Sequence, residues 1–387
     1  MSALDHHLRL SHELLARAHA GATYRAMLDE VIGFSTDGVM ISTAEHVAPF
    51  NRERTISILP QMALQAARLR GPATILILAG SLIPLDNFHY PRGFLLPEGA
   101  RWNQRFNLYP SRMKKAAPLM LPPVNGTTHS EADKFFQSYS WLKDTVNKVA
   151  AFETYAHQLS ACMEVISRKW FEDVAVPELK VRPLEAVARQ MLLRLIEEGD
   201  VVIDSILFDP RLRGEIARRL HGVFCAWGER QGSFLFWGNR DSRASRLQEH
   251  EGALVGGNIE VVLAKDSVAD ALRKGQLWPG AFLSLLVVSY LPGLPISGGP
   301  KQLQYYRSMI QAANSLGIEV RPESLSQQGY MTFDLCDLRL RRGDSQCFSD
   351  FGTGLALSRS GFELDFLIEQ MSAIEVVDPW GILYRYE

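Results

Sequence analysis

The first third of the chain alternates short apolar runs with polar turns, a pattern that predicts a strand, a helix and a second strand. An apolar run at 39–42 has the length of a buried strand, and a polar loop follows it to residue 50. Residues 51–70 then show apolar positions at helical spacing, and 74–78 form a second apolar run. Two strands joined through a helix indicate a parallel sheet with a right-handed crossover, so we expect an α/β protein.

Two later stretches have the spacing of long helices. Residues 130–171 and 183–199 are both helical in pattern, and the link between them reads as a turn or an extended segment. Two consecutive long helices predict a helical hairpin inserted into the sheet domain. We therefore expect three parts: the N-terminal half of a core at 1–129, the hairpin insertion at 130–205 and the C-terminal half at 206–387.

The C-terminal half mixes helices with short strands. An arginine-rich segment at 209–227 has helical spacing, and a strand is expected at 233–237. The Gly-Asn-Arg-Asp sequence at 238–241 has the composition of a turn. A further helix is predicted at 302–316, directly after a glycine-containing turn.

The composition is that of an ordinary globular protein. The 387 residues are 47% hydrophobic and 22% charged, with a formal net charge of −2, which argues against a whole-protein electrostatic grip on nucleic acid. The four cysteines show no CxxC spacing, so we expect no metal site and a reducing compartment. Since no apolar run reaches membrane-spanning length and no signal-peptide pattern is found, we expect a cytoplasmic protein without membrane contact.

Polar side chains follow both predicted strands, where open parallel sheets bind their ligands. His46 lies in the first loop, and an imidazole there can donate a hydrogen bond to a phosphate or act as an acid–base group. The alternative is a histidine that only packs the loop. We predict His46 to be catalytic and expect substrate or nucleotide contacts from the other polar residues of the two loops, Thr43, Asn51, Ser81, Asn87 and His89.

A glycine turn precedes the last predicted helix. Ser297, Gly298 and Gly299 lead into Pro300 and Lys301, so the backbone could approach an anion closely at a helix N-terminus. We expect these three residues to contact the ligand and Lys301 to neutralise developing charge as a second catalytic group. The turn is not a Walker A loop, and a tight turn with a solvated lysine is the alternative. Tyr305, one turn further on, is a candidate contact whose position also fits packing.

Basic residues are concentrated in two segments. Residues 92–115 hold six basic residues against one acid, and 211–246 hold eight arginines against three acids. The first cluster favours a phosphate or carboxylate ligand, and we expect Arg105 and Arg112 to clamp an acidic substrate group. A solvated basic face is the alternative for this cluster.

Several stretches together resemble the bacillithiol-synthase family of cysteine-adding ligases: 41–46, 75–81 with Asn87-Phe88-His89, 232–247 and 296–305. The resemblance implies a Rossmann-like core related to nucleotidyltransferases, and a helical element that forms a homodimer. It places His46 in the turn after the first strand and Gly298, Gly299 and Lys301 in the glycine turn. Where the family's first turn has a glycine, this chain has Ala44 or Glu45, so we expect a sibling reaction on another amine or amino acid.

The predicted function is an amino-acid-adding ligase of specialised metabolism, which forms an amide bond between an amino acid, cysteine being the first candidate, and a small-molecule amine. ATP is the expected cofactor, and an already activated donor is the alternative. Two other functions stay open. One is a non-catalytic scaffold that partners a biosynthetic enzyme, which the altered first turn favours. The other is an aminoacyl-tRNA-dependent transferase whose basic clusters contact RNA.

Overall fold

The computed structural model describes a little over half of the chain: residues 21–43, 45–47, 74–86, 94–95, 105–106, 108–125, 136, 140–170, 178–223, 233, 235–294, 296–297 and 300–315. The chain divides into two compact units. The first unit comprises Met1–Asp37, Leu184–Ile296 and Lys301–Gln327, and the second comprises Gly38–Pro183, Ser297–Pro300 and Gln328–Glu387. The domain boundaries predicted at 129 and 205 stay predictions.

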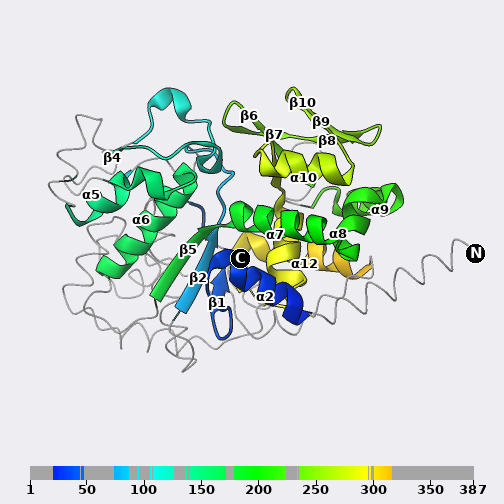
Figure 1. The fold of residues 1–387 in the computed structure, drawn as a ribbon, viewed down its shortest axis with the longest axis horizontal. Helices are drawn as coiled ribbons and strands as arrows, with labels where there is room; N and C mark the ends of the chain where they lie inside the picture. Colours follow the sequence, from blue (N-terminus) through cyan, green and yellow to red (C-terminus); the bar gives the residue numbers. More distant parts are fainter. Residues whose placement is uncertain are drawn as a thin grey trace, which may run out of the picture. The chain divides into compact units, whose positions relative to one another are not determined.

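A sheet with parallel strands forms the centre of the second unit. Its strand order is β12 (Ile296–Ser297), β1 (Met40–Ser42), β2 (Thr74–Ala79) and β5 (Glu178–Pro183). β2 pairs in parallel with β1 on one side and with β5 on the other (Figure 1). The side chains of 75–79 are all buried, as expected for a strand covered on both faces. The α/β class and the parallel pairing of 39–42 with 74–78 are thus confirmed, whereas a Rossmann-like topology stays a prediction.

The predicted helix 130–171 is interrupted within its described part. Helix α5 (Ser140–Asn147) is followed by the short turn η4 (Val149–Ala151) and then by α6 (Tyr155–Trp170). Gln158, on α6, binds the end of α5, because its buried amide donates to the carbonyl of Val146 at 2.6 Å. The same amide accepts from the N–H of Val124 at 2.9 Å and donates to its carbonyl at 2.7 Å. A helix carbonyl left without an intrahelical partner is thus satisfied by a side chain.

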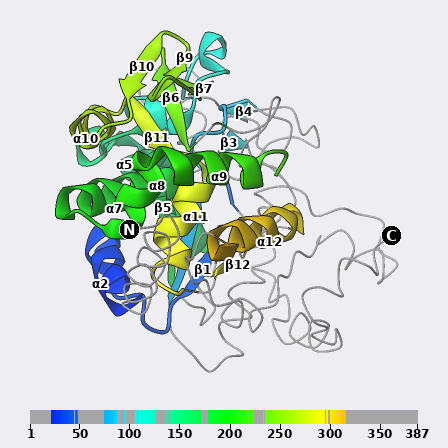
Figure 2. The ribbon, with the colours of Figure 1, turned by 90° about the vertical axis from the view of Figure 1, so that its right-hand side faces the viewer.

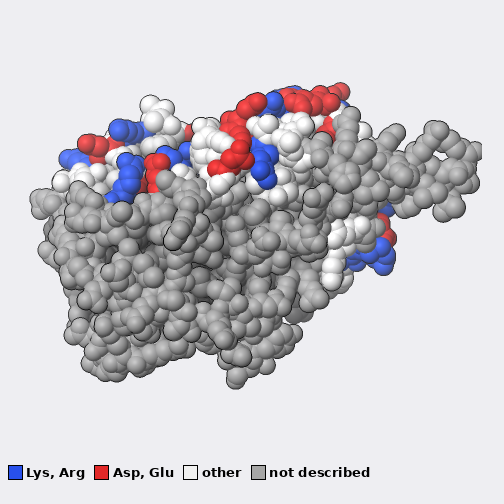
Figure 3. Space-filling model, turned by 90° about the horizontal axis from the view of Figure 1, so that it is seen from below, with Lys and Arg blue, Asp and Glu red and all other residues white. Residues whose placement is uncertain are grey.

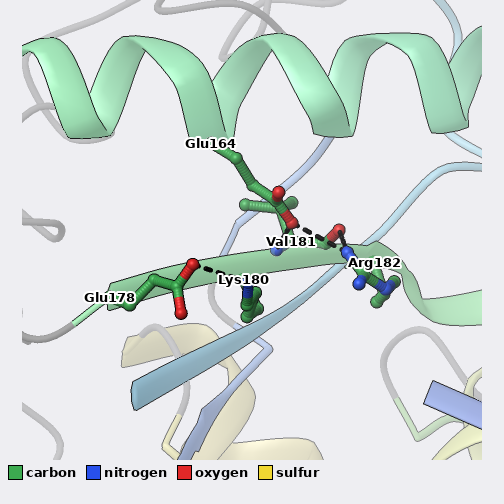
Figure 4. A network of polar contacts seen from close by, with 5 residues as sticks. All are labelled: Glu164, Glu178, Lys180, Val181 and Arg182. Atoms are coloured by element: carbon green, nitrogen blue, oxygen red, sulfur yellow. Dashed lines mark hydrogen bonds and ion pairs between the residues drawn. The ribbon is translucent and has the colours of Figure 1, made fainter. Parts of the chain in front are cut away.

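The segment predicted as a link at 174–182 contains a strand. β5 lies between α6 and α7 (Leu184–Glu198), so residues 130–205 do not form a simple helical hairpin. Figure 4 shows Glu164 reaching from α6 to β5, where its carboxylate accepts from the N–H of Val181 at 2.8 Å and from Arg182 at 2.7 Å. Lys180 and Glu178 form an ion pair at 2.6 Å. The homodimer through this helical element stays a prediction.

Cys162, on α6, is fully buried, and burial raises the pKa of its thiol. Since the thiolate is the reactive form, we expect the native protein to be alkylated at Cys162 on the order of 100-fold more slowly than the urea-unfolded chain. Peptide mass spectrometry after timed exposure to iodoacetamide measures this ratio. Equal rates in the native and unfolded states would contradict the burial of this thiol.

The first unit is mainly helical. Its described helices are α2 (Gly21–Ile32), α7, α8 (Val201–Phe208), α9 (Pro210–Leu220), α10 (Lys265–Arg273), α11 (Ala281–Leu285) with a π-helical turn at Leu286–Tyr290, and α12 (Pro300–Ser315), drawn in Figure 2. The helix predicted at 302–316 is confirmed by α12. Asp200 caps α8 by accepting from the N–H of Ile203 at 3.0 Å, and it also accepts from the hydroxyl of Tyr24 at 2.8 Å. This buried carboxylate therefore joins α2 to α8.

Helix α9 ends earlier than its sequence pattern indicates. Asp209 caps its start by accepting from the N–H of Arg211 at 2.8 Å. The helix ends at Leu220 rather than at 227, because His221 is extended and Gly222 takes a φ of +81°. A glycine in this left-handed conformation is a common helix stop.

Two small antiparallel sheets complete the first unit. One has the order β11 (Leu277–Pro279), β6 (Phe236–Arg240) and β7 (Arg243–Arg246), and the other β10 (Ile259–Val262), β9 (Ala253–Gly256) and β8 (Gln248–His250). The prediction of a turn at 238–241 is wrong in its position, since Gly238 to Arg240 belong to β6. The turn consists of Asp241 and Ser242, whose φ values are 50° and 63°. Gly238 instead leaves room for packing, because a Cβ there would lie 2.4 Å from the Cδ1 of Ile259.

Candidate functional site

Buried polar residues collect where β1 and β2 end. Thr43 follows β1 directly, and Ser81 comes two residues after the last residue of β2. Ser42, Thr43 and Ser81 are all buried. Because the two strands are parallel, their carboxyl ends lie at the same edge of the sheet, which is where open α/β sheets bind ligands.

The chain after β1 stays bound to the chain after β2. The N–H of Gly80 donates to the carbonyl of Glu45 at 2.8 Å, and the carbonyl of Gly80 accepts from the N–H of Val47 at 2.9 Å. Ser42 pairs with Ile77, whereas His46 pairs with Gly80, so the segment after β1 contains one residue more than the segment opposite it. Such a bulge changes the direction of the strand and of its side chains, and bulges are frequent beside active sites.

The bulge carries the half-buried His46 and the buried Glu45 at consecutive positions of the chain. His46 is half-buried, and its Nδ1 is shielded from solvent. The ring lies across Gly80, since a Cβ on that residue would be 3.3 Å from the Cδ2 of His46 and 3.9 Å from its Nε2. The side chain of Glu45 is 0% exposed. A partly enclosed imidazole at a ligand-binding edge is suited to proton transfer.

Gly80 gives a test of how closely the His46 ring is held. Gly80→Ala puts a methyl group 3.3 Å from Cδ2, so the ring must shift by a few tenths of an ångström. We expect a changed rate of His46 modification by diethylpyrocarbonate, with little change in melting temperature. Gly214→Ala is the matched control, because a Cβ there meets nothing within 4 Å. An unchanged rate in Gly80→Ala would contradict the described ring position.

The loop after β2 is tied to the segment that carries part of the first basic cluster. The N–H of Leu119 donates to the carbonyl of Ser81 at 3.2 Å, and the N–H of Asp86 donates to the carbonyl of Lys114 at 3.0 Å. The short helical turn η1 (Ser111–Met113) precedes Lys114 and contains Arg112. The side chains of Arg112 and Lys114 are exposed. The second unit therefore brings Thr43, His46 and Ser81 to one edge and joins the segment of Arg112 to it through backbone hydrogen bonds.

The other predicted site residues are placed only in part. Arg105 pairs with Leu95 in a two-stranded sheet of β3 (Phe94–Leu95) and β4 (Arg105–Phe106), and Ser297 ends β12. Lys301 and Tyr305 lie in the first two turns of α12. Their predicted roles stay predictions. Five predicted site residues fall outside the described residues: Asn51, Asn87, His89, Gly298 and Gly299.

Sequence reasoning did not select Glu45, although this residue stands directly before His46. The available signal was an acid in a loop that follows an apolar strand, but sequence alone does not show that the carboxylate is buried. Burial of a carboxylate is costly unless it is paired, so such residues concentrate at structural networks and functional sites. Its position at the strand end makes Glu45 part of the candidate site.

Three of the eight arginines of the second basic cluster form internal ion pairs. The guanidinium of Arg213 donates to both carboxylate oxygens of Glu249, at 3.1 and 2.7 Å. Arg218 and Arg219 share Glu215, and the hydrogen bond from Arg218 is the main cause that lowers the pKa of this carboxyl to about 2. On the face seen in Figure 3, acidic and basic side chains are interspersed over the part that the structure describes. These pairs weaken the case for RNA, which stays a prediction.

Among the described residues, no helix is long and apolar enough to cross a bilayer, and no three His, Cys, Asp or Glu side chains are grouped to hold a metal ion. No family model matches the chain, and no curated protein sequence matches it.

Proposed function

We propose that this chain is an amide-forming ligase that joins an amino acid to an amine, with His46 as the general base. The observation that carries the proposal is the half-buried imidazole of His46, held across Gly80 at the carboxyl edge of parallel strands. Acid–base groups at such edges act on bound small molecules in open α/β sheets. The sequence resemblance to cysteine-adding ligases supports the same class of reaction.

The proposed chemistry needs an activated carboxyl group. ATP would convert the carboxylate of the amino acid into an acyl phosphate or an acyl adenylate. The amine nitrogen then attacks the carbonyl carbon, a C–N bond forms, and the phosphate or AMP leaves with the electron pair of the broken C–O bond. Nε2 of His46 accepts the proton that the amine loses. General-base help of this kind contributes about 10²- to 10⁴-fold to the rate.

Other residues of the same unit have supporting roles in the proposal. The hydroxyls of Thr43 and Ser81 lie at the edge and would orient the substrate by hydrogen bonds. The exposed side chains of Arg112, Lys114 and Lys115 would hold the phosphate groups of ATP or an acidic substrate group, because guanidinium and ammonium groups bind such anions.

Ligand-dependent melting tests the proposed function. The purified chain is melted with ATP, AMP and each of the twenty amino acids, singly and in pairs. A ligand present at about 100 times its Kd stabilises the native state by about 2.7 kcal/mol, so we expect a shift of several degrees with ATP that one amino acid enlarges. A shift in melting temperature with an amino acid alone would indicate that the enzyme uses an already activated donor and not ATP. The absence of any shift would contradict the proposal and favour the scaffold function.

A further inference from the structure

The β6–β7 hairpin places two arginines directly opposite each other at its tip. Arg240 and Arg243 are the last pair before the turn, and both are exposed. The turn residues Asp241 and Ser242 have φ values of 50° and 63°, as in the tight type I′ turns of two-residue hairpins. Opposite residues of an antiparallel pair share one face, and like charges there repel each other. The hairpin therefore concentrates positive charge at one point.

These two arginines differ from five others in the first unit. Arg194, Arg213, Arg218, Arg219 and Arg273 all form ion pairs with glutamates. Within the described ranges, neither Arg240 nor Arg243 forms an ion pair, and this includes the carboxylate of Asp241 in the turn between them. The repulsion between them is thus not offset by an acid in this part of the chain.

The turn of a second hairpin lies beside the aliphatic part of the Arg240 side chain. The turn between β9 and β10 contains Gly257 and Asn258, with φ values of 56° and 68°. A Cβ on Gly257 would lie 3.1 Å from the Cδ of Arg240 and would overlap the hydroxyl of Ser245. Both hairpins are seen at the top of Figure 2. Ser245 lies on the same face as Arg240 and Arg243, because Gly238 is its partner across the strands.

We propose that the tip of the β6–β7 hairpin is a phosphate-binding site, in which Arg240 and Arg243 clamp a phosphate group of a small molecule and Ser245 adds a hydroxyl. Each guanidinium can donate two parallel N–H bonds to the oxygens of such a group. The stem of Arg240 is already packed against Gly257, so less side-chain freedom is lost on binding. This site lies in the first unit and does not depend on the proposed function.

Calorimetric titration with inorganic phosphate, and separately with ATP and a short RNA, tests the site. The double substitution R240Q/R243Q removes both guanidinium groups, and we expect inorganic phosphate to bind at least about tenfold more weakly, whereas ATP bound at the candidate site of the second unit would be unaffected. R211Q is the matched control. Arg211 is an exposed arginine of α9, and R211Q removes one positive charge, as each of the two hairpin substitutions does. R240K and R243K keep the charge but lose the planar fork, so we expect an intermediate affinity.

The outcomes distinguish a specific phosphate site from non-specific attraction of anions by surface charge. Loss of phosphate binding in the double variant, with R211Q unaffected, supports the site. Three results overturn it: no binding of phosphate at millimolar concentration, equal weakening by R211Q and the hairpin variants, or binding of RNA alone. The melting temperature of each variant shows whether the fold is intact, and these exposed substitutions should change it little.

Discussion

Replacing His46 by alanine is expected to lower the turnover number of the ligation reaction by at least about 100-fold. In the proposed reaction the variant would lose the group that accepts the proton of the attacking amine, while the backbone bonds between Gly80 and residues 45 and 47 remain. We therefore expect the melting temperature and the KM for the amino acid to change little. Steady-state kinetics with purified protein measure both parameters.

His250→Ala is the matched control for this substitution. His250 lies on β8 with its side chain exposed, so the same chemical change occurs away from the candidate site. Full turnover in the His250 variant and its loss in the His46 variant would support the assignment. Turnover within about twofold of the unchanged protein in His46→Ala would remove His46 from the catalytic machinery, since a general base contributes far more than this.

Glu249→Gln is expected to lower the free energy of unfolding by about 3 kcal/mol, because breaking a buried ion pair leaves one charge uncompensated. The side chain of Arg213 is 3% exposed and that of Glu249 28% exposed, so Arg213 cannot turn to solvent when its partner is neutralised. It would keep its hydrogen bond to the carbonyl of Leu207, at 2.8 Å. This contact joins α9 to β8, and urea unfolding measures its loss.

Glu30→Gln gives the comparison for an exposed pair. Glu30 binds Arg194 with side chains that are 64% and 39% exposed, so its loss should cost much less stability than the loss of Glu249. The double variant R213M/E249Q should regain stability relative to E249Q, because an apolar side chain then replaces the unpaired charge. Equal effects of Glu249→Gln and Glu30→Gln would show that burial of Arg213 does not set the strength of this contact.

The sequence predicts the central strands well where the chain is buried on both faces. Residues 75–78 are uninterrupted Ile and Leu, and both β2 and its parallel pairing with β1 are observed. β5 is harder to predict from the sequence, because Glu178, Lys180 and Arg182 alternate with its apolar residues. One face of this strand is charged, and the apolar residues alone give only a short period-two pattern.

Local composition misleads where glycine serves packing rather than a turn. Gly238 and Asn239 suggested the hairpin turn, but the structure uses Asp241 and Ser242, which tolerate positive φ at some cost. At the candidate site, the order of Thr43 and His46 after an apolar strand was enough to predict their common edge. The contribution of Glu45 and Gly80 depends on the bulge. The bulge arises from pairing between segments about 35 residues apart, so neither segment alone predicts it.

The measurement that tests the central claim most directly is mass spectrometry of the reaction mixture. The purified chain is incubated with ATP, each amino acid in turn, and a set of small primary amines, and the products are compared with those of His46→Ala. The account predicts an amide with the mass of amino acid plus amine minus water, formed together with ADP or AMP and lost in the variant. ATP cleavage without any amide, or an amide formed equally by His46→Ala, would contradict it.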